Sequence, residues 1–90
     1  MPISPLVLAN LTRWISHGVP PGHFLTAVLC NDLREAVVRA DDVNLAALPD
    51  IVNWIRFNAP PACWGSTQAV NRWRFSKRRE VREQPQEVEG

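Results

Sequence analysis

Residues 24–40 read FLTAVLCNDLREAVVRA, and apolar side chains recur in this stretch at steps of three and four residues. That spacing places them on one stripe of an α-helix, while polar residues from Asn31 to Asp42 fall on the opposite face. The stripe consists of Phe24, Leu25, Val28, Leu29, Leu33, Ala36, Val37 and Ala40. Because Asn31 can end one helix and Asp32 can cap another, the stripe is expected on either one helix or two successive helices.

The segment before this stretch carries the start and stop signals of another helix. Ser4 can cap free backbone N–H groups, and Pro5 suits the first helical position. Gly18 can adopt the left-handed conformation that commonly ends a helix. The sequence therefore predicts a helix over Pro5–His17, and Pro21 can open the next one.

A longer helix is expected after the stretch. Asp41 or Asp42 can cap it, and its apolar pattern ends near Asn58, before two prolines. Pro49 interrupts the pattern, because a proline inside a helix removes one hydrogen bond and clashes with the preceding turn. A break or kink is therefore predicted between Leu48 and Pro49.

The C-terminal quarter is expected to form a short helix and a charged tail. Ser66 can cap a helix over residues 67–75, and residues 76–82 can extend it as a polar continuation. Residues 84–90 are poor in apolar side chains and are predicted to be disordered. The sequence thus predicts one all-α domain over residues 1–75, a compact bundle of four to five short helices, followed by a charged, partly disordered tail over residues 76–90.

Size and composition limit the classes of protein to which this chain can belong. Ninety residues make one domain with a modest core, and no stretch has the length of uncharged apolar sequence that crosses a bilayer. The N-terminus lacks the basic region of a secretory signal peptide, so Cys30 and Cys63 are expected to be reduced thiols of a cytosolic protein. Charges balance as far as Trp73, and the residues that follow are first basic and then acidic.

Two cysteines and two histidines are the residues that could form a catalytic or metal site. They are Cys30, Cys63, His17 and His23. A thiol beside an imidazole can act as a nucleophile, and two thiols with two imidazoles can ligate zinc. Neither pair has the short spacing typical of zinc ligands, and small buried thiols with a histidine at a helix end explain the pattern more simply. No catalytic residue, cofactor or metal is predicted, and the chain is not expected to be an enzyme.

The strongest functional signal is a basic run in the closing helix and its continuation. Its members are Arg72, Arg74, Lys77, Arg78, Arg79 and Arg82. Trp73 and Phe75 interleave with them, and clustered cations with aromatic rings are typical of contacts to phosphates and stacked bases. A solvated terminal helix is the alternative, because Glu80 and Glu83 dilute the positive charge and Trp73 suits a core position.

Large aromatic side chains outside the apolar stripes suggest a protein-binding surface. The candidates are Trp54 and Phe57 in the helix that ends near Asn58, and Trp64 in the following connector. Exposed aromatic residues of this kind dominate the energetics of protein interfaces. In so small a domain the closing helix could equally well cover them.

Short blocks between Leu11 and Trp73 keep a characteristic spacing. They are His17-Gly18-Val19-Pro20, Gly22, Phe24-Leu25, Ala27-Val28-Leu29, Asn31-Asp32-Leu33, Arg39-Ala40-Asp41, Ala47-Leu48 and Cys63-Trp64-Gly65-Ser66. In these blocks the chain resembles a family of small, uncharacterised proteins of tailed bacteriophages. It departs from that pattern in Thr67, where a proline often follows the serine, and in the long charged tail after Phe75.

The resemblance implies a phage origin, expression in the cytoplasm of a host bacterium and no known enzymatic activity. Small phage accessory proteins frequently bind and inhibit a host protein, which is an analogy from origin and size. We therefore expect a non-enzymatic accessory protein that binds and modulates a bacterial host protein, in host takeover or anti-defence. Nucleic-acid binding through residues 72–82 is the alternative. Sequestration of a small nucleotide, with Arg34, Arg39 or Arg56 contacting its phosphates, is a third hypothesis.

Overall fold

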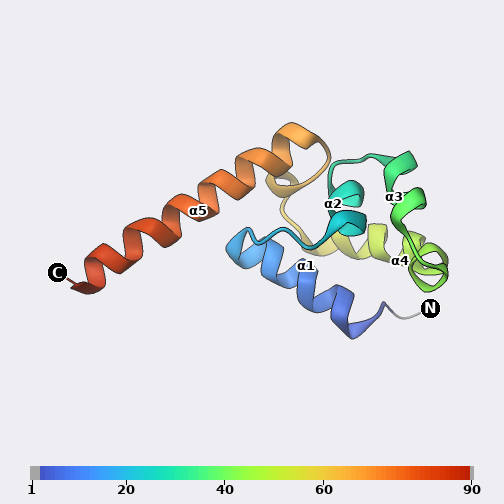
Figure 1. Cartoon of the computed structure of the whole chain (residues 1–90), viewed down its shortest axis with the longest axis horizontal. Coiled ribbons are helices and arrows are strands. Elements are labelled where there is room, and N and C mark those ends of the chain that lie inside the picture. Colours follow the sequence, from blue (N-terminus) through green and yellow to red (C-terminus); the bar gives the residue numbers. More distant parts are fainter. Residues whose placement is uncertain (1–2, 90) are drawn as a thin grey trace.

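The computed structural model describes the backbone of residues 3–89 and the side chains of residues 3–79. Over residues 3–89 the chain forms five α-helices and one turn of 3-10 helix, with no strand, which confirms the predicted all-α fold (Figure 1). In chain order the elements are α1 (Pro5–His17), α2 (His23–Leu29), α3 (Leu33–Arg39), α4 (Asp42–Asn58), η1 (Pro61–Cys63) and α5 (Thr67–Glu89).

The first helix begins and ends where the sequence predicts. The Ser4 hydroxyl accepts a hydrogen bond of 3.2 Å from the backbone N–H of Leu6, which satisfies one free donor of the first turn. Gly18 is left-handed at φ 69°, and its N–H donates to the Trp14 carbonyl. The next helix begins at His23 rather than at Pro21, because Gly22 takes a positive φ of 100° and only then turns the chain into α2.

The deciding stretch forms two helices rather than one. Asn31 is left-handed at φ 61°, and the Asp32 carboxylate accepts a hydrogen bond of 3.1 Å from the backbone N–H of Glu35. Beyond this turn the predicted stripe is only partly confirmed, because Ala36 is buried but Leu33 and Val37 are exposed. Its first half, around Leu25 and Val28, is buried, whereas Leu33 on α3 is exposed.

Pro49 does not divide the longer helix, so the break is wrong as one of the two predicted outcomes, a break or a kink. The Asp41 carboxylate caps α4 through a hydrogen bond of 2.7 Å from the Asn44 N–H, and the helix continues through Pro49 to Asn58. A proline here costs about 3 kcal/mol. Full burial of Ile51 and Ile55 on the same helix contributes about 1.5 to 3 kcal/mol for each side chain, which offsets that cost.

The core is centred on Trp14, whose side chain is almost completely buried. Its indole N–H donates a hydrogen bond of 3.1 Å to the Cys63 carbonyl, which ties α1 to η1. A second tie runs from the Gly65 N–H to the Leu29 carbonyl over 2.7 Å. Buried apolar side chains from all five helices pack around this centre, namely Val7, Leu11, Leu25, Val28, Leu29, Ala36, Ala47, Ile51, Ile55 and Val70.

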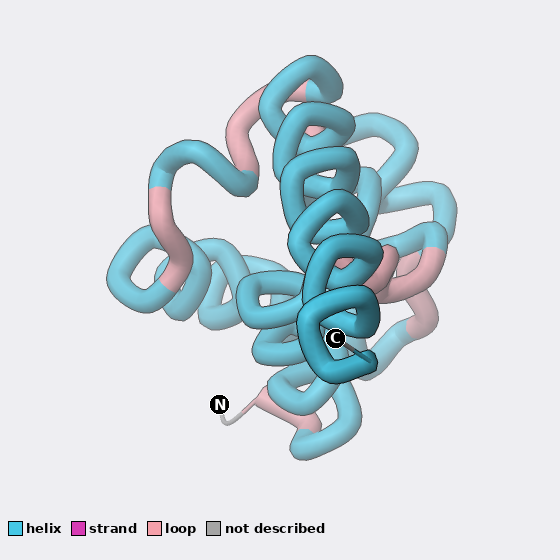
Figure 2. Tube along the Cα trace, turned by 90° about the vertical axis from the view of Figure 1, so that its left-hand side faces the viewer, coloured by secondary structure: helices cyan, strands magenta, loops and turns pink. Residues whose placement is uncertain are grey.

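The last helix joins the body at its beginning and then extends away from it (Figure 1). Ser66 caps α5 by accepting a hydrogen bond of 3.1 Å from the Ala69 N–H. The helix crosses the predicted boundary at residue 75 without interruption, and Figure 2 looks along it toward the other helices. The backbone of α5 continues to Glu89, through the segment predicted to be disordered, and side chains from residue 80 onward lie outside the described part of the structure.

Candidate functional site

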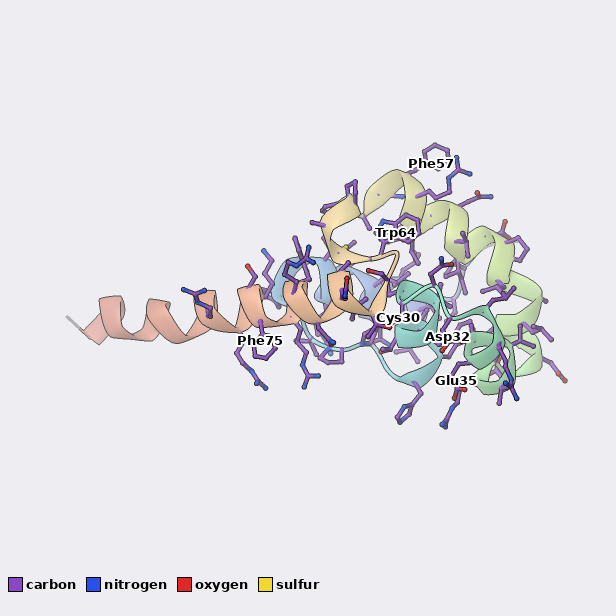
Figure 3. The ribbon with its side chains drawn as sticks, turned by 90° about the horizontal axis from the view of Figure 1, so that it is seen from above. Cys30, Asp32, Glu35, Phe57, Trp64 and Phe75 are labelled. Carbon is purple, nitrogen blue, oxygen red and sulfur yellow. The ribbon has the colours of Figure 1, made fainter. Side chains whose placement is uncertain are left out.

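The three aromatic residues expected at a protein interface have different environments. Phe57 is 78% exposed and projects from α4 (Figure 3), with the Arg56 guanidinium 5.2 Å from its ring centroid. Trp54 and Trp64 are half-buried and pack against the core. Trp54 and Phe57 border one shallow hollow, which Trp64 does not reach. Of the three aromatic side chains, Phe57 is therefore the one that is mostly exposed.

The basic run divides into residues that share a groove and residues that do not. Arg74, Arg78 and Arg79 line an open groove of about 570 Å³ between α5 and the end of α1, together with His17 and Phe75. The remaining members have other surroundings. Arg72 is exposed outside the groove, Lys77 is half-buried with its ammonium 4.8 Å from the Trp73 ring centroid, and the side chain of Arg82 lies outside the described part.

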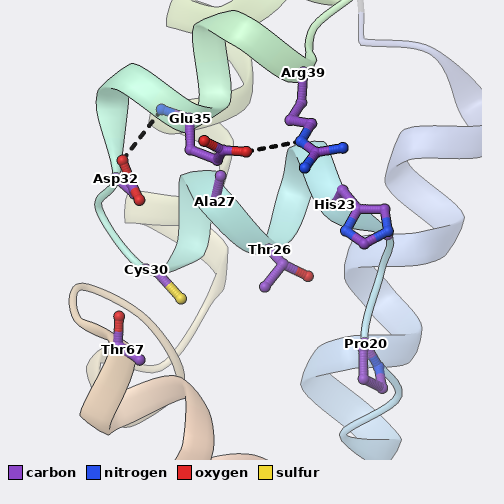
Figure 4. Close-up of a pocket in the computed structure, with 10 residues that line it drawn as sticks. Pro20, His23, Thr26, Ala27, Cys30, Asp32, Glu35, Arg39 and Thr67 are labelled. Carbon is purple, nitrogen blue, oxygen red and sulfur yellow. Dashed lines mark hydrogen bonds and ion pairs between the residues drawn. The ribbon is translucent and has the colours of Figure 1, made fainter.

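The cysteines and histidines are not assembled into one site. Cys63 is fully buried, and its burial raises the pKa of the thiol, although hydrogen bonding partly opposes the shift. His17 lies in the groove against α5. His23 and Cys30 border the same pocket, but they lie at opposite ends of α2 (Figure 4). The length of this seven-residue helix is about 10 Å. Among the described residues no cluster of His, Cys, Asp and Glu side chains could hold a metal ion.

The pocket that contains His23 and Cys30 has a volume of about 540 Å³, and its lining includes the charged residues Asp32, Glu35 and Arg39 (Figure 4). On one wall the Arg39 guanidinium donates to the Glu35 carboxylate over 2.7 Å. Arg39 is therefore paired with a carboxylate within this pocket. The other two arginines proposed to contact a nucleotide do not line the pocket. Arg34 is exposed elsewhere on α3, and Arg56 lies over Phe57 on α4. The three arginines therefore do not converge on a common phosphate position.

Sequence reasoning missed an apolar surface on α3 and the start of α4, which we call the corner surface. Its members are Leu33, Val37, Val38, Val43 and Leu45. Leu33 is 69% exposed and Val38 is 67% exposed, although both lie in the stretch that reads as a core helix. The signal that could have revealed the surface is the Asn31 and Asp32 pair, because a second helix after a turn need not continue the first helix's buried face.

A groove of about 350 Å³ adjoins the corner surface between α3 and α4. Its walls are mainly apolar and include Leu33, Ala36, Leu48 and Val52. Leu33 therefore belongs to both the groove and the corner surface. Asn31, Asp32 and Asn53 supply polar groups around the same groove.

No protein-family model, curated protein or solved structure matches this chain. The resemblance to small phage proteins therefore stays a prediction. Among the described residues, no helix combines the length and the apolar character that crossing a bilayer requires.

Proposed function

We propose that this chain is a non-enzymatic binding protein that engages a partner protein through the corner surface. The observation that carries the proposal is the exposure of five large apolar side chains within α3 and the start of α4, above all Leu33 and Val38. Keeping such side chains in water forgoes the free energy that burial would provide. Contiguous exposed apolar surface on a small domain is typical of a protein interface.

The groove beside the corner surface indicates what the partner presents. An apolar knob, such as a leucine side chain, fits the walls formed by Ala36, Leu48 and Val52. A basic or amide side chain next to that knob could pair with the groove's polar residues, Asp32 among them. We therefore propose an amphipathic helix of the partner as the segment that lies in the groove.

The partner is proposed to be a bacterial host protein whose activity the chain modulates, in host takeover or anti-defence, in the host cytoplasm. The support for this finer proposal is the resemblance of the sequence blocks to small tailed-phage proteins. Phe57, which is 78% exposed on α4, is a second candidate contact outside the corner surface and its groove.

The experiment compares two glutamate substitutions in a pull-down from bacterial lysate. Leu33→Glu places a charge on the corner surface. Leu6→Glu is the matched control, because Leu6 is also 69% exposed and also lies in the first turn of its helix. We expect Leu33→Glu to reduce the amount of a stoichiometric partner at least tenfold, and Leu6→Glu to retain it.

Two results would contradict the proposal. Equal capture by both variants would show that the corner surface does not form the interface. A homodimer that Leu33→Glu disrupts, seen by light scattering, would mean that a second copy of this chain covers the surface instead. Thermal unfolding of each variant provides the check that both remain folded.

A further inference from the structure

The groove between α1 and α5 is held in shape by contacts beneath it. The Trp73 indole N–H donates a hydrogen bond of 3.1 Å to the Trp14 carbonyl, which fixes α5 against α1. Gly18 lies so close to α5 that an added Cβ would be 2.6 Å from the Lys77 Cβ. The end of α1 and the first half of α5 therefore meet at close range, and the side chains above this contact form a built groove.

Helical spacing places three guanidinium groups along one side of this groove. Arg74 and Arg78 are four residues apart, and so are Phe75 and Arg79, which gives two neighbouring rows on α5. Each arginine is exposed and carries a positive charge at any physiological pH. No described carboxylate lines the groove, and His17 adds an imidazole N–H donor on the opposite wall. The site is thus suited to an anion with several charges.

Phe75 adds an aromatic surface between these cations. Its side chain is 65% exposed and points away from the ribbon of α5 (Figure 3), although it lines the same groove as Arg74 and Arg78. Val19 and Pro20 supply further apolar surface on the α1 side. A phosphate ion or an acidic side chain would leave this apolar surface in water, whereas an unpaired nucleobase would cover it.

We propose that this groove binds single-stranded nucleic acid. Arg74, Arg78 and Arg79 contact consecutive phosphates, and a base stacks on Phe75. A single strand fits better than a duplex, because stacking on a side chain requires a base that is free of its neighbours. The site is separate from the corner surface, since the two share no residue.

The test measures fluorescence anisotropy of labelled single-stranded DNA and RNA of mixed sequence with the full chain at several salt concentrations. Three phosphate contacts predict that the logarithm of affinity falls against the logarithm of salt with a slope of about −2. Arg74→Ala and Arg78→Ala should each reduce the size of that slope by about 0.7. Arg34→Ala, an exposed arginine on α3, is the control and should leave the slope unchanged.

A second pair of variants separates stacking from charge. Phe75→Leu keeps an apolar side chain but removes the aromatic ring, and we expect affinity to fall roughly five- to hundredfold with the salt slope retained. Phe57→Leu is the matched control, because Phe57 is also an exposed phenylalanine beside an arginine. It should bind as the unmodified chain does.

Several outcomes would overturn the proposal. They are no binding of a single strand at low salt, tighter binding of a duplex of the same sequence, and equal binding of polyglutamate. The first outcome would show that the groove does not bind single-stranded nucleic acid. The second would indicate a duplex ligand, and the third would indicate a site for polyanions in general. The Leu33→Glu variant should bind nucleic acid normally, and Arg78→Ala should retain the protein partner, so each proposal can fail without the other.

Discussion

The carbonyl oxygen of Trp14 accepts a hydrogen bond of 3.1 Å from the indole N–H of Trp73, fifty-nine residues later in the chain. The same oxygen also accepts the N–H of Gly18 at the end of α1. One backbone group near the centre of the molecule therefore closes the first helix and holds the last. This double role makes Trp14 the residue on which the arrangement of α1 and α5 depends.

Trp14→Phe should destabilise the protein by about 2 to 4 kcal/mol, because it leaves the Cys63 carbonyl without its donor and opens a void in the core. Urea unfolding gives the free energy directly. Trp64→Phe is the matched substitution, since the Trp64 indole N–H is buried without a hydrogen-bond partner among the described residues. Removing that donor should cost clearly less, and equal costs for the two variants would contradict the assigned hydrogen bonds.

Gly18→Ala should destabilise the protein by more than the cost of the left-handed backbone alone, which is about 1 to 2 kcal/mol. The extra cost arises because the new Cβ would meet the Lys77 Cβ at 2.6 Å. Asn31→Ala is the comparison, because it places an alanine at a similar φ of 61°. Thermal unfolding should show the larger loss for Gly18→Ala, and a smaller loss would argue against close contact between α1 and α5.

Pro49→Ala should stabilise the protein by about 1 to 3 kcal/mol. Alanine restores the N–H that can bond to the Leu45 carbonyl, and no core packing is lost because Pro49 is exposed. Chemical unfolding measures the gain. Ala46→Pro provides the opposite test on the same helix and should be strongly destabilising, so a neutral result for both would mean that α4 is not continuous.

Cys63 should make stability fall at alkaline pH. Burial raises the pKa of its thiol above the ordinary value, so the unfolded chain loses this proton first as the pH rises. The stability that the protonated thiol contributes is complete below the unfolded pKa and is lost as the pH rises from there toward the folded pKa. Unfolding free energies between about pH 7 and about pH 10 should decline less in Cys63→Ala than in the unmodified chain.

Thiol labelling gives an independent check of the same environment. Both cysteines are free, Cys30 is half-buried and Cys63 is fully buried. A thiol reagent should modify Cys30 in the folded protein and Cys63 only after unfolding. Rapid modification of both would contradict the buried position of Cys63.

Local signals in the sequence were sufficient for most of the helix ends. Ser4, Gly18, Asp41 and Ser66 act through hydrogen bonds to residues a few positions away, so their roles can be read without knowledge of the tertiary structure. Pro49 was misjudged because its local cost is outweighed by burial of Ile51 and Ile55, which depends on the packing of other helices.

The surfaces were less predictable than the helices. Leu33 follows a turn, and the direction of α3 after that turn is set by tertiary contacts that periodicity does not contain. The groove against α5 combines residues 17–20 with residues 74–79, and their approach depends on Trp14 and Trp73. The sequence revealed the basic run itself, because charge clustering is local, but not its partner His17.

The distribution of the groove along the chain has a consequence for how this protein can change. Among residues 3–79, every buried side chain comes from Val70 or earlier, whereas the arginine wall begins at Arg74. A stop codon placed after Trp73 would therefore keep the buried core and the hydrogen bond from Trp73 to Trp14. It would delete the wall of the groove that Arg74, Arg78 and Arg79 form. The arginine wall can therefore be altered or lost without touching the buried side chains, although residues 17–20 still form the opposite wall of the groove.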